Sequence, residues 1–212
     1  MILVGQMDSP FLRRVAVTMN HYRLPFERKP LSVFKDLKAL SAINPLGKVP
    51  ALVLDDNETL FDSQMILDYL DETAGPDVSL TPPAGEDRRK VLRIATVALG
   101  IAEKVVALNI ETRIRAEGTT DPRIVRRYEG QVKSGLQWLE AEAPNPNQGP
   151  DQDPWFMGPA ITQADVTAAS VLTHMHEKRP ELFSPETTPA LAALRMRAEA
   201  LEIFKASPFE EA

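Results

Sequence analysis

Several short stretches near the start of the chain combine polar side chains with helix or turn signals. In the first, Ser9 stands directly before Pro10 and Phe11, after a short apolar run. Serine is a favoured N-cap and proline a favoured first helical residue, so this spacing predicts the start of a helix. A hydroxyl at a helix N-terminus is also a prepared site for an anion. On this stretch alone, capping and binding both stay open.

A second stretch runs Asn44-Pro45-Leu46-Gly47-Lys48-Val49-Pro50 ahead of an apolar run. Its prolines and glycine predict a tight connection. If the bond before Pro50 is cis, Val49 offers an unpaired N–H and C=O at the end of a sheet. A short peptide can then dock there as an extra strand. Lys48 either holds a carboxylate of such a peptide or is simply solvated.

A third stretch places Asp62 and Ser63 at the start of a predicted helix. Both residue types favour helix caps, which is sufficient reason for their presence. As a binding site, the Ser63 hydroxyl and the neighbouring amides suit a carboxylate, while Asp62 suits an ammonium group. The pattern supports both interpretations.

These polar groups need a framework, and the first part of the chain alternates strand-like with helix-like segments. The alternation predicts a mixed sheet covered by helices, that is, an α/β domain. Strands are expected over residues 1–5, 26–31, 51–54 and 59–61, and helices over residues 11–21, 34–43 and 63–73.

Composition changes from residue 76, where prolines, glycine and small polar residues replace the apolar periodicity. We therefore expect residues 1–75 to form one domain, residues 76–86 a linker, and residues 87–212 an all-helical domain. The spacing from Thr162 to Asp165 predicts a capping box ahead of an apolar helix. The other helices are expected over residues 87–117, 123–143 and 189–204, with a polar loop over residues 144–154.

Composition excludes several classes of function. The chain has 43% hydrophobic and 25% charged residues and a net charge of −6, which makes nucleic acid and membranes poor partners. It contains no cysteine, so disulfides, thiolate metal sites and cysteine nucleophiles are excluded. The first residues lack a signal-peptide pattern and no long uncharged apolar run occurs, so a cytoplasmic location is expected. The histidines do not form a metal set, and no metal cofactor is expected.

Taken in order, the motifs resemble those of the cytosolic glutathione S-transferases, in the bacterial-type form with serine at the sulfur-binding position. The resemblance implies a thioredoxin-like N-terminal domain, a helical-bundle C-terminal domain, a homodimer and a detoxifying transferase activity. It covers nearly the whole chain and is carried by residues 9–15, 44–50, 60–63 and 162–165.

The resemblance also implies roles for single residues. Ser9 matches the residue that donates a hydrogen bond to the sulfur of glutathione. Val49, before a cis Pro50, pairs with the cysteinyl backbone. Asp62 and Ser63 hold the γ-glutamyl end, where the family more often has Glu than Asp before the serine. Lys48, by its position in the second motif, assists at the glycyl carboxylate.

Glutathione transfer needs a thiolate, because the neutral thiol is a poor nucleophile. An unperturbed thiol with a pKa of about 8.5 is only roughly 3% ionised at neutral pH. Lowering that pKa by about two units requires roughly 2.7 kcal/mol. A hydrogen bond from Ser9 supplies about 1.5–3 kcal/mol and the helix N-terminus up to about 2 kcal/mol. Without cysteine, a mixed-disulfide route is excluded, while conjugation, reduction, isomerisation and dehalogenation stay open.

A pocket for a small hydrophobic electrophile is expected between the first loop and the first long helix of the second domain. The apolar candidates also fit an ordinary core stripe. Two other functions use the same features: a non-catalytic binding or regulatory protein of this fold, and a carrier of apolar small molecules. The pocket candidates are Met7, Phe11, Leu99, Glu103, Val106 and Ile110.

Overall fold

The structure is a computed structural model that describes residues 1–145 and 154–211. The chain divides into two compact units, one formed by residues 1–88 together with 198–212 and the other by residues 89–197. Most of the polar loop expected over residues 144–154 lies outside the described residues.

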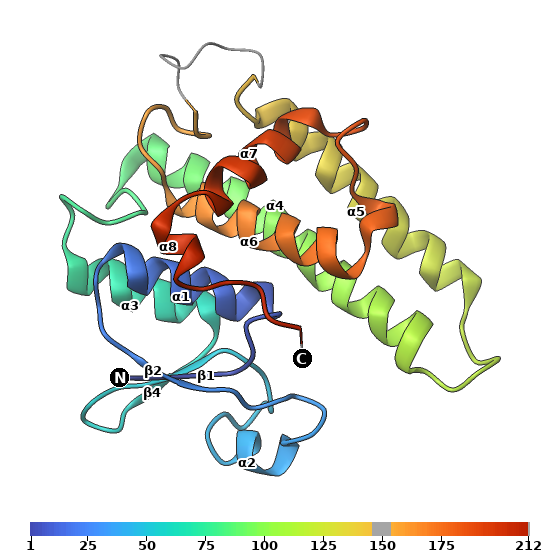
Figure 1. The fold of residues 1–212 in the computed structure, drawn as a ribbon, viewed down its shortest axis with the longest axis horizontal. Coiled ribbons are helices and arrows are strands. Elements are labelled where there is room, and N and C mark those ends of the chain that lie inside the picture. The colour runs from blue at the N-terminus through green and yellow to red at the C-terminus, as the bar shows by residue number, and fades with distance from the viewer. Residues whose placement is uncertain (146–153, 212) are drawn as a thin grey trace. The chain divides into compact units, whose positions relative to one another are not determined.

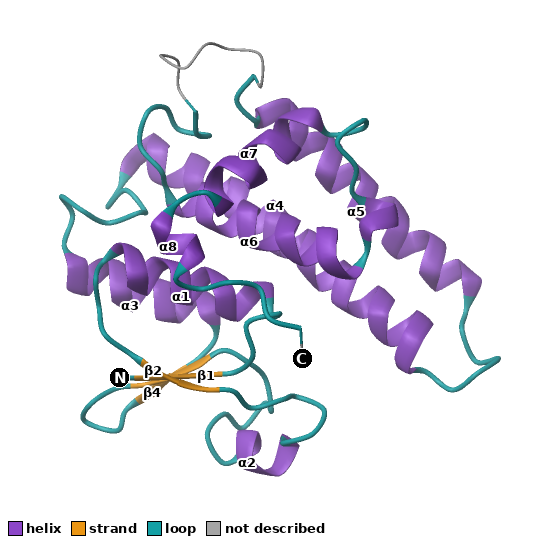
Figure 2. Ribbon diagram, viewed as in Figure 1, coloured by secondary structure: helices purple, strands orange, loops and turns teal. Residues whose placement is uncertain are grey.

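The first unit is built on a four-stranded sheet with the order β2-β1-β3-β4 (Figure 2). The strands are β1 (Ile2–Val4), β2 (Glu27–Lys29), β3 (Ala51–Val53) and β4 (Thr59–Leu60). β1 is parallel to β2 and antiparallel to β3, and β3 is antiparallel to β4. The sheet is therefore mixed, as the alternation of segments predicted.

Helices cover both faces of this sheet (Figure 1). On one face lie α1 (Pro10–His21) and α3 (Ser63–Ala74), and on the other the short α2 (Leu37–Ser41). Both long helices begin where the sequence predicted, because Ser9 and Asp62 occupy their N-cap positions. The prediction of a helix over 34–43 was too long. The main core of this unit contains Leu3, Met7, Leu12, Val15, Met19, Leu52, Ile66, Leu67 and Leu70.

The last residues of the chain return to the first unit, where α8 (Glu202–Lys205) packs against α1. The Phe204 side chain is buried, with the Arg13 guanidinium 5.4 Å from its ring centre. The Asn20 side chain donates to the carbonyl of Ile203 at 2.9 Å. The sequence boundaries placed these residues in the second domain, because contacts between residues so far apart leave no local signal. The domain limits as a whole stay a prediction.

The second unit is helical. Its main elements are α4 (Gly85–Asn109), α5 (Pro122–Glu142), α6 (Gln163–Lys178) and α7 (Pro189–Glu199), of which α4 and α7 each run a few residues into the first unit. The predicted helix over 189–204 was wrong, since α7 and α8 are separate helices. A 3-10 turn, η2 (Pro180–Leu182), follows α6. None of the helices in the described ranges is both long and apolar enough to cross a membrane.

The predicted capping box at the start of α6 is present. The buried Asp165 carboxylate accepts from the Thr162 N–H at 2.8 Å and from the Phe156 N–H at 2.9 Å. Burial raises the pKa of Asp165, while these hydrogen bonds act in the opposite direction. The box therefore ties the segment before α6 to the first turn of the helix.

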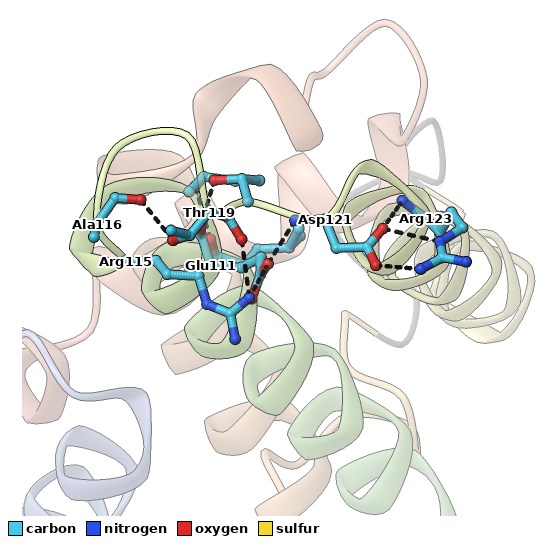
Figure 3. Close-up of polar contacts among 9 residues, drawn as sticks. Glu111, Arg115, Ala116, Thr119, Asp121 and Arg123 are labelled. Atoms are coloured by element: carbon cyan, nitrogen blue, oxygen red, sulfur yellow. Dashed lines mark hydrogen bonds and ion pairs between the residues drawn. The ribbon is translucent and has the colours of Figure 1, made fainter.

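The connection from α4 to α5 is fixed by polar contacts (Figure 3). Here the predicted helix over 87–117 gives way to a π-helical turn, η1 (Ile110–Ile114). Within it, the buried Glu111 carboxylate accepts from the Asp121 N–H at 3.0 Å and from Arg115 at 3.1 Å. The Asp121 side chain in turn caps α5 by accepting from the Arg123 N–H at 2.8 Å. Side chains thus satisfy main-chain N–H groups at the start of α5.

Candidate functional site

Ser9 lies at the N-terminus of α1, directly before Pro10 in the first helical position. Its backbone is extended, with φ −73° and ψ 120°. The side-chain Oγ accepts from the Leu12 N–H at 3.4 Å, which is the long end for a hydrogen bond. The cap is therefore weak, and the hydroxyl hydrogen is left to donate to another acceptor. Ser9 is partly exposed.

Gly5 brings the end of β1 close to two other parts of the first unit. Its φ is +133°, a conformation that favours glycine. A Cβ at this position would lie 2.5 Å from the Leu12 side chain and 2.8 Å from Cβ of Val49. The close approach therefore depends on glycine, and it sets α1 beside the segment before β3.

The segment before β3 has the geometry that peptide docking requires. The peptide bond between Val49 and Pro50 is cis, as the resemblance implied. The buried Asn44 side chain shapes the preceding turn by donating to the Lys48 carbonyl at 2.8 Å and accepting from the Leu46 N–H at 3.0 Å. Among the described residues, none forms a hydrogen bond with the main-chain N–H or C=O of Val49. These two groups are free to pair with an extended ligand.

Lys48 projects from the same turn with an exposed side chain. Within residues 1–145 and 154–211, no carboxylate forms an ion pair with its ammonium group. The solvated and the ligand-binding interpretations of Lys48 therefore both remain.

Asp62 and Ser63 lie at the N-terminus of α3. The Asp62 carboxylate accepts from the Gln64 N–H at 2.8 Å and is otherwise exposed. Ser63 is the first residue of the helix and is only 2% exposed. Its Oγ accepts two hydrogen bonds from the Arg14 guanidinium, from Nε at 3.2 Å and from Nη2 at 3.0 Å. An acidic group and a hydroxyl thus stand together at a helix start, where the helix dipole favours anions.

Arg14 is the residue of this region to which the sequence assigned no role. It lies in α1 and its side chain is fully buried. Burial lowers the pKa of Arg14 to about 10, and the nearby Asp62 acts in the opposite direction. The available signal was a pair of arginines between Leu12 and Val15, inside a helix whose neighbouring positions are apolar. That signal marks an unusual position without saying what the side chain contacts.

The residues predicted to line the electrophile pocket are divided between the two units. In the first unit, Met7 is 1% exposed and belongs to the core, while Phe11 is half-buried. In α4, Leu99 and Val106 are half-buried and Glu103 is exposed, 3.8 Å from the neighbouring Lys104. The pocket itself stays a prediction. Across the described residues, no group of three or more His, Asp or Glu side chains is placed to hold a metal ion.

The fold defines the class of protein: a thioredoxin-like unit followed by an all-helical unit. Residues 3–78 match the family model described as "Glutathione S-transferase, N-terminal domain". The chain is 30% identical to Glutathione S-transferase U6 of Arabidopsis thaliana over 176 residues, which cover 83% of this chain and 72% of the relative. The chain belongs to the glutathione S-transferase family.

Other curated relatives match over shorter lengths. YibF, an uncharacterized GST-like protein of Escherichia coli, is 29% identical over 60% of this chain and 63% of its own length. Probable maleylacetoacetate isomerase 2 of Drosophila melanogaster is 35% identical over 45% of this chain, and the match spans 44% of the isomerase. The chain thus spans less than two thirds of both of these relatives.

Solved structures confirm the predicted fold class over the full chain. A glutathione S-transferase from Methylobacterium radiotolerans, in complex with glutathione sulfonate, is 27% identical and superposes with a TM-score of 0.88 over 100% of this chain and 96% of its own. One from Methylobacillus flagellatus, with glutathione bound, is 26% identical with a TM-score of 0.86 over 97% of this chain and 98% of its own.

Proposed function

We propose that the protein is a glutathione transferase that binds glutathione on its first unit and stabilises the thiolate for attack on a small hydrophobic electrophile. The observation that carries the proposal is that the main-chain N–H and C=O of Val49, before a cis Pro50, form no hydrogen bond with the described residues. They belong to the same unit as the N-termini of α1 and α3, where Ser9 and Ser63 lie. Two similar proteins of solved structure hold glutathione or glutathione sulfonate, which supports the same ligand here.

In the proposed complex, the cysteinyl backbone of glutathione pairs with the N–H and C=O of Val49. The γ-glutamyl carboxylate accepts from the Ser63 hydroxyl and nearby amides, while its ammonium group faces Asp62. Lys48 is exposed beside this edge and suits the glycyl carboxylate. Asp62 lies at the N-cap and its shorter side chain, compared with Glu, limits its reach toward the ammonium group.

The chemistry assigned to this chain is a single hydrogen bond at the sulfur. Ser9 donates its hydroxyl hydrogen to the thiolate, because Ser9 Oγ only accepts in its bond from the Leu12 N–H and that hydrogen is left unused. A charge-assisted hydrogen bond of this kind stabilises the anion by about 1.5–3 kcal/mol. The α1 N-terminus adds up to about 2 kcal/mol. Together these two contributions cover the roughly 2.7 kcal/mol that a two-unit fall in the thiol pKa requires.

Calorimetric titration with glutathione at neutral pH, alongside ultraviolet absorbance of the thiolate, tests the proposal. We expect binding by the wild type, and loss of the thiolate signal in Ser9→Ala with most of the binding retained. Ser184→Ala, just before a turn of the second unit, is the matched control and keeps both signals. Absence of glutathione binding by the wild type would overturn the proposal. Binding without any thiolate signal or turnover would favour a non-catalytic binding protein of the same fold.

The same proposal includes a homodimer, a cytoplasmic location, a detoxifying role and a pocket for the electrophile. Light scattering of the purified protein checks the dimer, with twice the mass of one chain as the expected result. A panel of electrophiles, read by loss of free thiol, checks the co-substrate class. Reduction, isomerisation and dehalogenation that depend on glutathione would appear in the same panel as products other than a stable conjugate.

A further inference from the structure

The contact between Arg14 and Ser63 fixes the direction of a hydroxyl group. Both N–H groups on one edge of the Arg14 guanidinium point at Ser63 Oγ, at 3.2 Å from Nε and 3.0 Å from Nη2. Both residues are buried, with Ser63 2% exposed. A buried guanidinium held by two bonds on one oxygen has little freedom to turn, so the contact is a rigid one.

The hydrogen-bonding capacity of the two groups decides what the hydroxyl can still do. A serine hydroxyl has one donor hydrogen and two acceptor lone pairs, whereas a guanidinium has donors only. Since Ser63 Oγ already accepts twice from Arg14, its hydrogen must point away from the guanidinium. None of the described residues accepts a hydrogen bond from Ser63 Oγ. The hydroxyl is therefore a donor without an acceptor inside this part of the chain.

The surroundings of that donor favour an anion as the missing acceptor. Ser63 is the first residue of α3, so main-chain N–H groups of the first helical turn lie beside its side chain, of which that of Gln64 is already capped by the Asp62 carboxylate. The positive guanidinium of Arg14 stands directly behind the hydroxyl, and positive charge in a buried setting strengthens hydrogen bonds to anions. The exposed Asp62 carboxylate next to it suits a cationic group on the same ligand.

We propose that Arg14 is a positioning residue for glutathione: it holds the Ser63 hydroxyl as an obligate donor to the α-carboxylate of the γ-glutamyl group. The proposal rests on the proposed function, since glutathione supplies that carboxylate. Arg14 itself does not touch the ligand in this arrangement. It acts by occupying the acceptor side of Ser63 and by placing a positive charge behind it.

A purely structural role for Arg14, as a tie between α1 and α3, predicts a different outcome from a positioning role. Two ligands separate the two roles: glutathione, and the analogue in which 4-aminobutyrate replaces the γ-glutamyl residue and the α-carboxylate is absent. The ratio of their dissociation constants measures recognition of that carboxylate. Because both ligands are titrated into the same sample, the ratio is independent of the fraction of folded protein.

We expect the wild type to prefer glutathione over the analogue, and Arg14→Met to reduce that preference by roughly tenfold, equivalent to about 1.4 kcal/mol. Affinity for the analogue should change little. Ser63→Ala should reduce the preference by a similar factor, and the double variant should show no further loss, because the two residues act through one hydroxyl. Arg14→Lys, which keeps the charge and can still donate to Ser63 Oγ, should restore part of the preference.

The adjacent buried arginine provides the matched control. Arg13→Met should lower stability and leave the ratio of the two dissociation constants unchanged, since Arg13 contacts Glu199 and Ser207 instead. If Arg14→Met weakens both ligands by the same factor, or if its effect adds in full to that of Ser63→Ala, the positioning role is overturned and a structural one remains. Failure of the wild type to bind glutathione would overturn the proposed function and this inference together.

Discussion

Two neighbouring arginines of α1 serve the molecule in opposite ways. Arg13 and Arg14 are both buried, with 1% and 0% of their surface exposed. The Arg13 guanidinium meets a carboxylate of the chain itself, with bidentate bonds of 2.6 and 2.7 Å to Glu199. The Arg14 guanidinium donates to the neutral side chains of Gln64 and Ser63, and the donor hydrogen of the Ser63 hydroxyl has no acceptor among the described residues. The contact of Arg13 pairs two charges within the free protein, whereas the contact of Arg14 leaves the Ser63 hydroxyl to donate to a ligand.

The difference shows how the same residue type can stabilise a fold or prepare a site. A bidentate arginine–carboxylate pair is among the stronger polar contacts and fixes geometry as well as charge. Arg13 adds a third bond, from Nε to the Ser207 carbonyl at 2.9 Å, so the C-terminal segment is held at two points. By contrast, the bonds from Arg14 to the Ser63 hydroxyl are longer. Because that hydroxyl is neutral, the contact does not offset the positive charge of Arg14, which can then attract an anionic ligand.

The largest expected effect is that of Arg13→Met on stability. The substitution keeps the volume roughly constant and removes both hydrogen bonds that the Arg13 guanidinium donates to the Glu199 carboxylate. Breaking a buried pair on one side costs roughly 3–5 kcal/mol, and because Glu199 is 27% exposed we expect a value near the lower end, about 3 kcal/mol. Urea unfolding followed by circular dichroism measures the loss. A cost below about 1 kcal/mol would show that the pair is not what holds the C-terminal segment.

The Tyr22 hydroxyl is a second polar group whose partners lie within the protein. Its removal should lower the free energy of unfolding by about 2 kcal/mol. The Tyr22 hydroxyl donates to the Asp71 carboxylate and accepts from the Leu80 N–H at 2.6 Å. Tyr22→Phe leaves both groups without that partner, which weakens the attachment of the segment around Leu80 to α1 and α3. Thermal unfolding at neutral pH checks the expected loss, and an unchanged midpoint would contradict it.

The same hydroxyl gives a pH dependence with a definite sign. Burial, and then the hydrogen bond to Asp71, raise the pKa of Tyr22. The folded state therefore keeps the Tyr22 proton at a pH where the unfolded chain, with a pKa of about 10, has lost it. This contribution to stability is fully present below about pH 10 and falls as the pH rises further. Stability of the wild type should decline more steeply than that of Tyr22→Phe in this range, and parallel curves would refute the assignment.

Arg14→Met should cost less stability than Arg13→Met, about 1 kcal/mol, although it should cost more in carboxylate recognition. The loss of the Arg14 bonds to the neutral side chains of Ser63 and Gln64 is partly offset because a buried cation is no longer taken out of water. Urea unfolding of the two variants side by side, combined with the ligand ratio, tests the contrast. If the two substitutions lower the free energy of unfolding equally and neither changes the ratio of the two dissociation constants, the two arginines do not differ in role.

The smallest effect is expected for an exposed pair of similar geometry. Arg28 donates two bonds, of 2.9 and 2.6 Å, to Glu210, which also joins the C-terminal segment to the rest of the first unit. Its side chains are 36% and 48% exposed, so solvent screens the attraction. Arg28→Met should change the free energy of unfolding by at most about 0.5 kcal/mol. A cost comparable to that of Arg13→Met would mean that the effect at Arg13 comes from joining the C-terminal segment to the rest of the unit, and not from the burial of the ion pair.

Features set by neighbouring residues were predictable from the sequence. Ser9, Asp62 and Thr162 mark helix starts correctly, because capping depends on main-chain groups two or three residues away. The mixed sheet followed from the alternation of segments, and the cis bond before Pro50 from the resemblance. In each case the information lies in a short window or in a motif.

Features set by distant contacts were not predictable. The break between α7 and α8 has no glycine or proline to announce it, and the return of the last residues to the first unit depends on the Arg13–Glu199 pair across 186 positions. The π-helical turn after α4 depends on the contacts of Glu111 with the start of α5. The partner of Arg14 likewise lies in another helix, 49 positions away. Local propensity carries no record of such partners.

The return of the C-terminal segment to α1 has a consequence for synthesis of the chain. Arg13 leaves the ribosome before Glu199, which follows 186 residues later. At translation rates of roughly 5–20 residues per second, the arginine waits on the order of 10–40 s for its carboxylate. Once β4 has been made, the first unit has all four strands but still lacks α8 and the contacts of Arg13 with the C-terminal segment. Translation order therefore supplies the strands of the first unit before the helices of the second unit, and supplies α8 of the first unit after them.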